Sequence, residues 1–234
     1  MGRSLNSSAR EVAGFGILTA LALVLGALDR AIPLSALLGG AVPGLKLGLA
    51  NTVLLYAIYT MNIRSCFLLM AAKVALSGFL FGSLSAMLYS LAGGILSLLT
   101  MLLAKKKGSA GLLAGMAVCI ACEFALLRRY ATPRGQVLWS ILVIAMAGLL
   151  ILCVFLLLKR NAGMEVIGVS VVGAATHNLG QILTAAWILR TPQLLWSYLP
   201  FLLGLGAAVG CLTGIIAHRV MRALPKMRDV GRSA

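Results

Sequence analysis

The segment from Gly168 to Gln181 holds the densest group of side chains that could bind a solute. It reads Gly-Val-Ser-Val-Val-Gly-Ala-Ala-Thr-His-Asn-Leu-Gly-Gln, and in a helix its small and polar residues share one face. The imidazole and the amides on that face donate and accept hydrogen bonds, which indicates a binding site; the alternative is that they only join helices, as small and polar residues in membranes do. The face spans an arc of about 120° and comprises Ser170, Gly173, His177, Gly180, Gln181 and Thr184, with Asn178 beside it.

A second group of candidate residues lies in the segment from Pro43 to Asn51, which reads Pro-Gly-Leu-Lys-Leu-Gly-Leu-Ala-Asn. Pro43 and Gly44 interrupt regular structure just before an apolar helix, which Lys46 is expected to open. A lysine at a helix N-terminus favours an anion through both its charge and the helix dipole. The alternative is that Lys46 extends its ammonium to the membrane surface and binds nothing.

Lys73 and Tyr89 are further polar residues inside apolar stretches. A charge at the bilayer centre costs about 2.5–3.5 kcal/mol, and no carboxylate is close to Lys73 in sequence, so its partner is a distant residue or a ligand. Tyr89 starts a helically spaced stripe with Gly93, Ser97 and Thr100, and either lines a cavity or packs helices. The candidate solute-binding residues are therefore Lys46, Asn51, Lys73, Tyr89, His177, Asn178 and Gln181.

The sequence lacks the motifs of the common catalytic and metal sites. Prenyl or phosphoryl transfer needs clustered carboxylates that hold Mg²⁺ between phosphates, whereas the two aspartates, Asp29 and Asp229, are far apart. P-loop, GxSxG and HExxH patterns are also missing. Cys119 and Cys122 form a CxxC without a second pair or clustered histidines, so they are interpreted as small apolar helix residues. We therefore expect no enzymatic activity, no metal and no cofactor.

These residues are embedded in a very apolar chain. Of its 234 residues, 61% are hydrophobic and 11% are charged, and the mean hydropathy is +1.04, whereas a soluble domain has about 45–50% apolar and about 25% charged residues. The net charge of +15 could suggest nucleic acid as a partner, but the cations lie between apolar runs and not on one solvated face. The composition predicts an all-α, polytopic membrane protein within a lipid bilayer.

Apolar runs long enough to cross a bilayer predict about eight helices. With the N-terminus inside, thirteen of the 20 cations lie on the cytoplasmic side, in agreement with the positive-inside rule. We therefore expect one integral domain over residues 1–234 in the cell membrane, with both termini cytoplasmic. The helices are expected at residues 11–29, 46–61, 65–81, 84–104, 109–127, 136–158, 164–189 and 194–217.

Three motifs in combination resemble the Gx transporter family, which is also labelled heptaprenyl diphosphate synthase component I. They are residues 43–51, residues 168–181 and the segment 90–97, Ser-Leu-Ala-Gly-Gly-Ile-Leu-Ser. That family is similar to the substrate-binding S components of energy-coupling-factor (ECF) transporters. The resemblance covers roughly residues 12–104 and 164–217 and implies a six-helix core; residues 108–163 have no counterpart and are expected to form an inserted helical hairpin.

The resemblance also implies a function, which is substrate binding for small-molecule uptake. The cationic candidate residues favour an anionic or phosphate-bearing solute. In S components, small residues spaced by four on the first helix meet the coupling subunit, which implies contacts with an ECF coupling subunit and its ATPases at Gly16, Ala20, Ala22 and Gly26. The alternative is a membrane accessory subunit of a heptaprenyl diphosphate synthase or of a quinone- or flavin-linked electron-transfer system. A third hypothesis is a scaffold whose polar stripes only pack helices.

Overall fold

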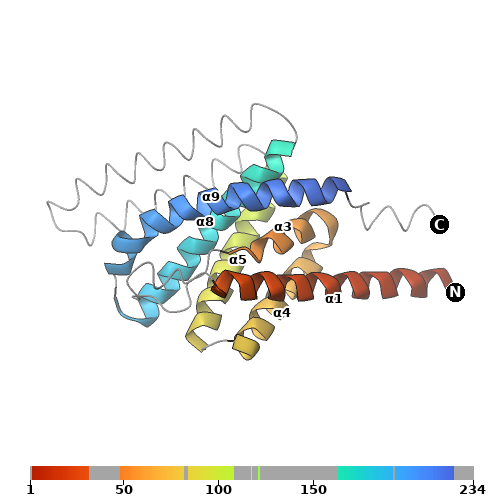
Figure 1. Ribbon diagram of the computed structural model, residues 1–234, viewed down its shortest axis with the longest axis horizontal. Coiled ribbons are helices and arrows are strands. Elements are labelled where there is room, and N and C mark those ends of the chain that lie inside the picture. The colour runs from red at the N-terminus through yellow and green to blue at the C-terminus, as the bar shows by residue number, and fades with distance from the viewer. Residues whose placement is uncertain are drawn as a thin grey trace.

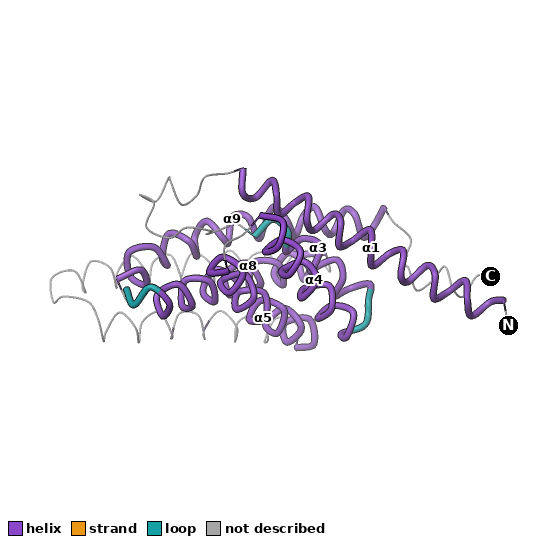
Figure 2. The backbone as a smooth tube through the Cα atoms, turned by 90° about the horizontal axis from the view of Figure 1, so that it is seen from below, coloured by secondary structure: helices purple, strands orange, loops and turns teal. Residues whose placement is uncertain are grey.

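A computed structural model describes residues 2–31, 48–81, 84–107, 163–191 and 193–223, with two isolated positions at 117 and 121. Within these ranges the chain consists of helices joined by short loops, and no strand occurs (Figure 2). Five of the helices described are long and apolar enough to cross a membrane. The chain is therefore a polytopic helical membrane protein, as its composition predicted. The expected helices at 109–127 and 136–158 lie almost wholly outside the described residues.

Three of the expected spans are observed in the first half of the chain. They are α1 (Gly2–Ala31), α4 (Ile63–Phe81) and α5 (Leu84–Lys107). The predicted break within the long apolar stretch that α4 and α5 share is confirmed, because α4 ends at Phe81 and α5 begins at Leu84. The start of α1 and the end of the last helix, α9 (Gln193–Ala223), point toward the same end of the molecule (Figure 1).

Helix α8 (Gly163–Ile188) is the central element of the bundle, and a short turn joins it to α9 (Gln193–Ala223). Of the apolar span of α8, 94% is buried, compared with 28–39% of the other four candidate spans. It packs chiefly against α9 and α5. A helix that is covered on all sides can place polar side chains away from lipid, so α8 is suited to carry a site.

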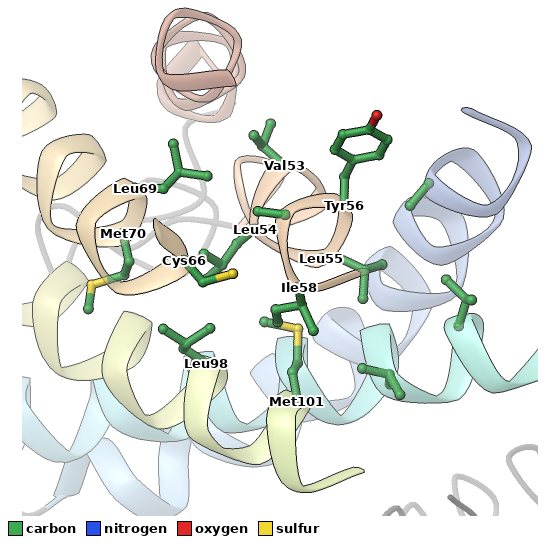
Figure 3. Close-up of a cluster of buried hydrophobic side chains, with 14 of the residues drawn as sticks. Val53, Leu54, Leu55, Tyr56, Ile58, Cys66, Leu69, Met70, Leu98 and Met101 are labelled. Carbon is green, nitrogen blue, oxygen red and sulfur yellow. The ribbon is translucent and has the colours of Figure 1, made fainter. Parts of the chain in front are cut away.

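Helix α3 (Asn51–Thr60) is too short to cross the bilayer. Its 10 residues rise about 15 Å, half of the roughly 30 Å of hydrocarbon, and Val53 to Ile58 are buried in the core. Figure 3 shows Leu54 and Ile58 on the side of α3 that faces Cys66 of α4 and Met101 of α5. The N-terminus of α3 therefore lies inside the protein instead of at a membrane surface.

The start of α3 differs from the predicted helix over residues 46–61, because Gly48 to Ala50 form a turn. The N–H of Asn51 donates to the carbonyl of Gly48 at 2.8 Å, and Gly48 has a φ of 89°. A side chain is rarely tolerated at such a φ, so glycine is required there. Within the described part of this apolar run, helical structure therefore begins at Asn51.

Candidate functional site

A small cavity lies where α1, the turn before α3, α4, α5 and α8 meet. Its volume is about 20 Å³, enough for one water molecule. The walls carry a carboxylate, an ammonium, an imidazole and two hydroxyls within an otherwise apolar bundle. The described residues that line the cavity are Ala22, Gly26, Asp29, Gly48, Ala50, Lys73, Val74, Ser77, Ser90 and His177.

Lys73 brings a positive charge to this cavity from the middle of α4. Its Nζ donates to Oδ1 of Asn51 at 2.9 Å, so the first residue of α3 provides an acceptor for an ammonium that lipid would not solvate. Asn51 itself is buried, and its Nδ2 has no hydrogen-bond partner among the described residues. The sequence predicted both residues for one site, and the structure joins them by a direct hydrogen bond.

Asp29 is the ionisable residue of the cavity wall that sequence reasoning missed. It lies in the last turn of α1 and is 2% exposed. One oxygen, Oδ2, accepts the N–H of Gly48 at 2.7 Å and the N–H of Leu49 at 3.1 Å. These donors directly precede α3, where the helix dipole favours negative charge. The anion that the sequence suggested for this helix N-terminus is therefore, in the structure, a carboxylate of the chain itself.

The signal that could have found Asp29 is its place at the end of an apolar span. An acidic residue that follows seventeen apolar or small positions, Val12 to Leu28, must reach a membrane surface or a buried partner. Nothing in the local sequence identifies that partner, because the donors are backbone groups 19 and 20 residues away.

His177 reaches the cavity from the middle of α8 and is 4% exposed. It lies where the backbones of α8 and α5 pass close to each other, at Gly180 and Gly93. A Cβ built on Gly93 would be 2.7 Å from the His177 carbonyl oxygen and 3.0 Å from its Nδ1. A Cβ built on Gly180 would be 2.8 Å from the Cα of Gly93. The two glycines allow this contact and so fix the depth at which the imidazole lies.

The remaining predicted solute-binding residues do not line the cavity. Asn178 donates through Nδ2 to the carbonyl of Leu202 at 2.7 Å, a contact that joins α8 to α9. Gln181 and Tyr89 are fully buried, and neither the amide atoms of Gln181 nor the Tyr89 hydroxyl has a partner among the described residues. Lys46 lies outside the described residues.

The polar stripes of α5 and α8 also join helices. The hydroxyls of Thr100 and Thr176 are 2.7 Å apart and connect α5 to α8. The hydroxyls of Ser170 and Thr213 are 2.9 Å apart and connect α8 to α9. The two interpretations of the α8 face, a binding site and contacts that only join helices, thus apply to different residues. Some of its polar groups pair with neighbouring helices, while His177 faces the cavity.

The four small residues of α1 divide between two environments. Gly16 and Ala20 are exposed on the described surface, whereas Ala22 and Gly26 are buried and line the cavity. A contact with a partner subunit through all four would therefore need the cavity wall to change.

Metal-binding chemistry has no clustered donors in the part of the chain that is described. No group of three or more His, Cys, Asp or Glu side chains there could hold a metal ion. Cys119 and Cys122, the CxxC pair, are outside the described residues.

Comparison with known proteins gives one match. A family model described as heptaprenyl diphosphate synthase component I matches residues 18–128 and 116–220. These two matches together span most of the chain, including every residue that lines the cavity. No curated protein and no solved structure matches the chain.

Proposed function

The chain belongs to the heptaprenyl diphosphate synthase component I family, and from its buried polar cavity we propose that it is a substrate-binding integral membrane subunit for small-molecule uptake. The observation that carries the proposal is the meeting of Asp29, Lys73 and His177 from three helices at one cavity. Ionisable side chains inside a membrane protein are costly and commonly mark a solute or ion pathway. A bundle that only needed to pack could use apolar residues at these positions.

The volume of the cavity limits what it holds in this conformation. About 20 Å³ accommodates a water molecule, whereas small-molecule sites usually have about 300–1,000 Å³. In this proposal the helices around the cavity therefore separate when a solute enters. The polar residues then meet the polar end of the solute, and the apolar walls meet the rest.

The charges of the lining refine the class of solute. Lys73 is the one lysine or arginine in the described lining, and the Asp29 carboxylate lies in the same wall. A solute with several negative charges would be repelled by Asp29, although one anionic group could reach Lys73. We therefore expect a solute whose polar end has both donors and acceptors, with at most one negative charge.

The proposal includes no catalysis by this chain alone. Prenyl transfer requires carboxylates grouped around Mg²⁺, and Asp29 already accepts two backbone N–H groups. Any energy for uptake would come from a partner or an ion gradient. We propose a location in the cell membrane with both termini cytoplasmic, because that orientation places most of the basic residues inside.

Bound solute can test the site directly. The full chain is purified from native membranes in mild detergent and denatured, and the released small molecules are identified by mass spectrometry. Lys73→Met and His177→Ala are compared with Thr213→Val, which removes a hydroxyl pair between α8 and α9 away from the cavity. Loss of a hydrogen bond to a charged group costs about 1.5–3 kcal/mol, so Lys73→Met should retain at least tenfold less solute.

The control fixes how the result is interpreted. Thr213→Val should retain the same solute at a level close to that of the unchanged chain. If no small molecule is enriched with the unchanged chain, or if the site variants retain as much as the control, the proposal of a solute-binding subunit is wrong.

The family description favours a second candidate function, a membrane accessory subunit of a heptaprenyl diphosphate synthase. Affinity purification from native membranes separates the two. Recovery of a soluble synthase component whose product output depends on this chain would support the accessory role. Recovery of a coupling subunit with paired ATPases would support uptake.

A further inference from the structure

Asp29 connects two parts of the bundle that are far apart in sequence. Its carboxylate lies at the end of α1, and its Oδ2 accepts two N–H groups from the turn that leads into α3, at 2.7 and 3.1 Å. Hydrogen bonds to an ionised acceptor are about twice as strong as those between neutral groups, and burial excludes water that would compete for them. The carboxylate therefore attaches this turn firmly to α1.

The attached turn determines where α3 begins. The N–H of Asn51 donates to the Gly48 carbonyl at 2.8 Å, and the N–H of Thr52 donates to the Leu49 carbonyl at 3.1 Å. The space beside the turn is narrow, because a Cβ built on Gly48 would be 3.1 Å from Nδ2 of Asn51 and 3.4 Å from Cδ2 of His177. A displacement of the turn would therefore move Asn51 or press on the imidazole.

Asn51 in turn holds the ammonium of the site. Its Oδ1 accepts Nζ of Lys73 at 2.9 Å. A continuous series of hydrogen bonds thus runs from the carboxylate of Asp29 through the backbone of Gly48 and Leu49 to Asn51 and Lys73. The series includes two of the residues that the sequence predicted for the site, Asn51 and Lys73, and one that it did not, Asp29.

We propose that Asp29 is a positioning residue, whose negative charge keeps the turn before α3 in place and so keeps the cavity closed around Lys73 and His177. This inference rests on the proposed function only for the identity of the cavity as the solute site. In this arrangement Asp29 acts through Gly48 and Asn51. Loss of its charge should loosen the turn and open the cavity while the transmembrane helices stay packed.

Opening of the cavity can be measured without a solute. In a full-length chain whose five cysteines are replaced, Ser77→Cys places a thiol in the cavity wall. The rate at which a small methanethiosulfonate modifies this thiol in detergent micelles reports access to the cavity. Ser97→Cys is the matched reporter, because Ser97 is fully buried on α5 and does not line the cavity.

Asp29→Asn retains the shape of the side chain and removes its charge. We expect the modification rate of the Ser77→Cys thiol to rise about tenfold in Asp29→Asn, and the rate of the Ser97→Cys thiol to stay within twofold. In Asp29→Glu, which restores a carboxylate, the modification rate of the Ser77→Cys thiol should be closer to that of the unchanged chain than it is in Asp29→Asn. Elution as a single species and an unchanged helical content by circular dichroism would show that the bundle is intact.

Two outcomes would overturn the inference. An equal rate for the Ser77→Cys thiol with and without the Asp29 charge would show that the charge does not hold the cavity closed. A rise at both reporters, or a loss of the folded species in Asp29→Asn and Asp29→Glu alike, would show that Asp29 supports the whole bundle and not the site. Neither outcome depends on whether the chain binds a solute, so a failure here is distinct from a failure of the proposed function.

Discussion

The closest approach of α5 and α8 makes a stability prediction that can be worked from distances. A Cβ added at Gly180 would lie 2.8 Å from the Cα of Gly93 and 3.0 Å from both the Gly93 nitrogen and the Ala92 oxygen. Carbon atoms in contact prefer about 3.5–4.0 Å, so the helices must separate by about 1 Å. All three neighbours are backbone atoms and cannot rotate away. Overpacking of this kind typically costs about 1–3 kcal/mol, which is the expected fall in the free energy of unfolding of Gly180→Ala.

The assay is unfolding by sodium dodecyl sulfate in mixed micelles, followed by far-ultraviolet circular dichroism. Gly16→Ala is the control, because a Cβ there meets nothing within 4 Å. The loss in the free energy of unfolding of Gly94→Ala should lie between those of Gly180→Ala and Gly16→Ala. Its new Cβ would be 3.2 Å from the Met70 side chain, which is flexible enough to move. If Gly180→Ala unfolds at the same detergent fraction as Gly16→Ala, the backbones of α5 and α8 do not approach as closely as described, and the account of how His177 is placed is wrong.

Three further substitutions test separate parts of the fold. Gly48→Ala should lower the free energy of unfolding by at least about 1–2 kcal/mol, because its φ of 89° places a Cβ in a left-handed conformation; the same detergent titration measures it. Thr213→Val should cost about 0.6 kcal/mol, the average for a hydrogen bond between membrane helices, and should leave the thiol access of the cavity unchanged. Lys105→Met should lower stability by about 1 kcal/mol, because its ammonium donates to the Ile58 carbonyl near the end of α3 at 2.7 Å; Lys106→Met is the control and should cost less.

The bounds of the spanning helices and the need of a buried charge for a partner were predictable from the sequence, because one physical rule dominated each of them. The length of the apolar runs predicted α4, α5 and α8 within a few residues, because a segment that crosses hydrocarbon must satisfy its backbone as a helix. The cost of a charge inside the membrane predicted that Lys73 has a distant partner or ligand. Both inferences need only the local sequence and the bilayer as solvent.

The parts that were not predictable depend on which elements become neighbours. Residues 46–61 resemble a single helix by hydropathy, yet Gly48 to Ala50 form a turn that is bonded to the Asp29 carboxylate, and α3 begins at Asn51. The helical periodicity of α8 placed His177 on one face and Asn178 beside that face, but it could not show that Asn178 meets α9 while His177 meets a cavity. Periodicity gives the direction of a side chain around one helix and not the identity of the helix that it faces.

The arrangement of α8 gives a criterion for separating a binding subunit from a scaffold. In a scaffold, every polar group of α8 serves packing. The loss of solute retention in a variant should then be proportional to its loss of stability. In a binding subunit, Gly180→Ala should reduce both stability and solute retention, because it displaces the helix that carries His177. Thr213→Val should reduce stability alone, since its hydroxyl joins α8 to α9. Lys73→Met should reduce retention by more than its change in stability explains, because Lys73 lines the cavity. The loss of solute retention can be plotted against the loss of stability for the three variants. Points on a single line would favour the scaffold, and a point for Lys73→Met that lies off this line would favour the binding subunit.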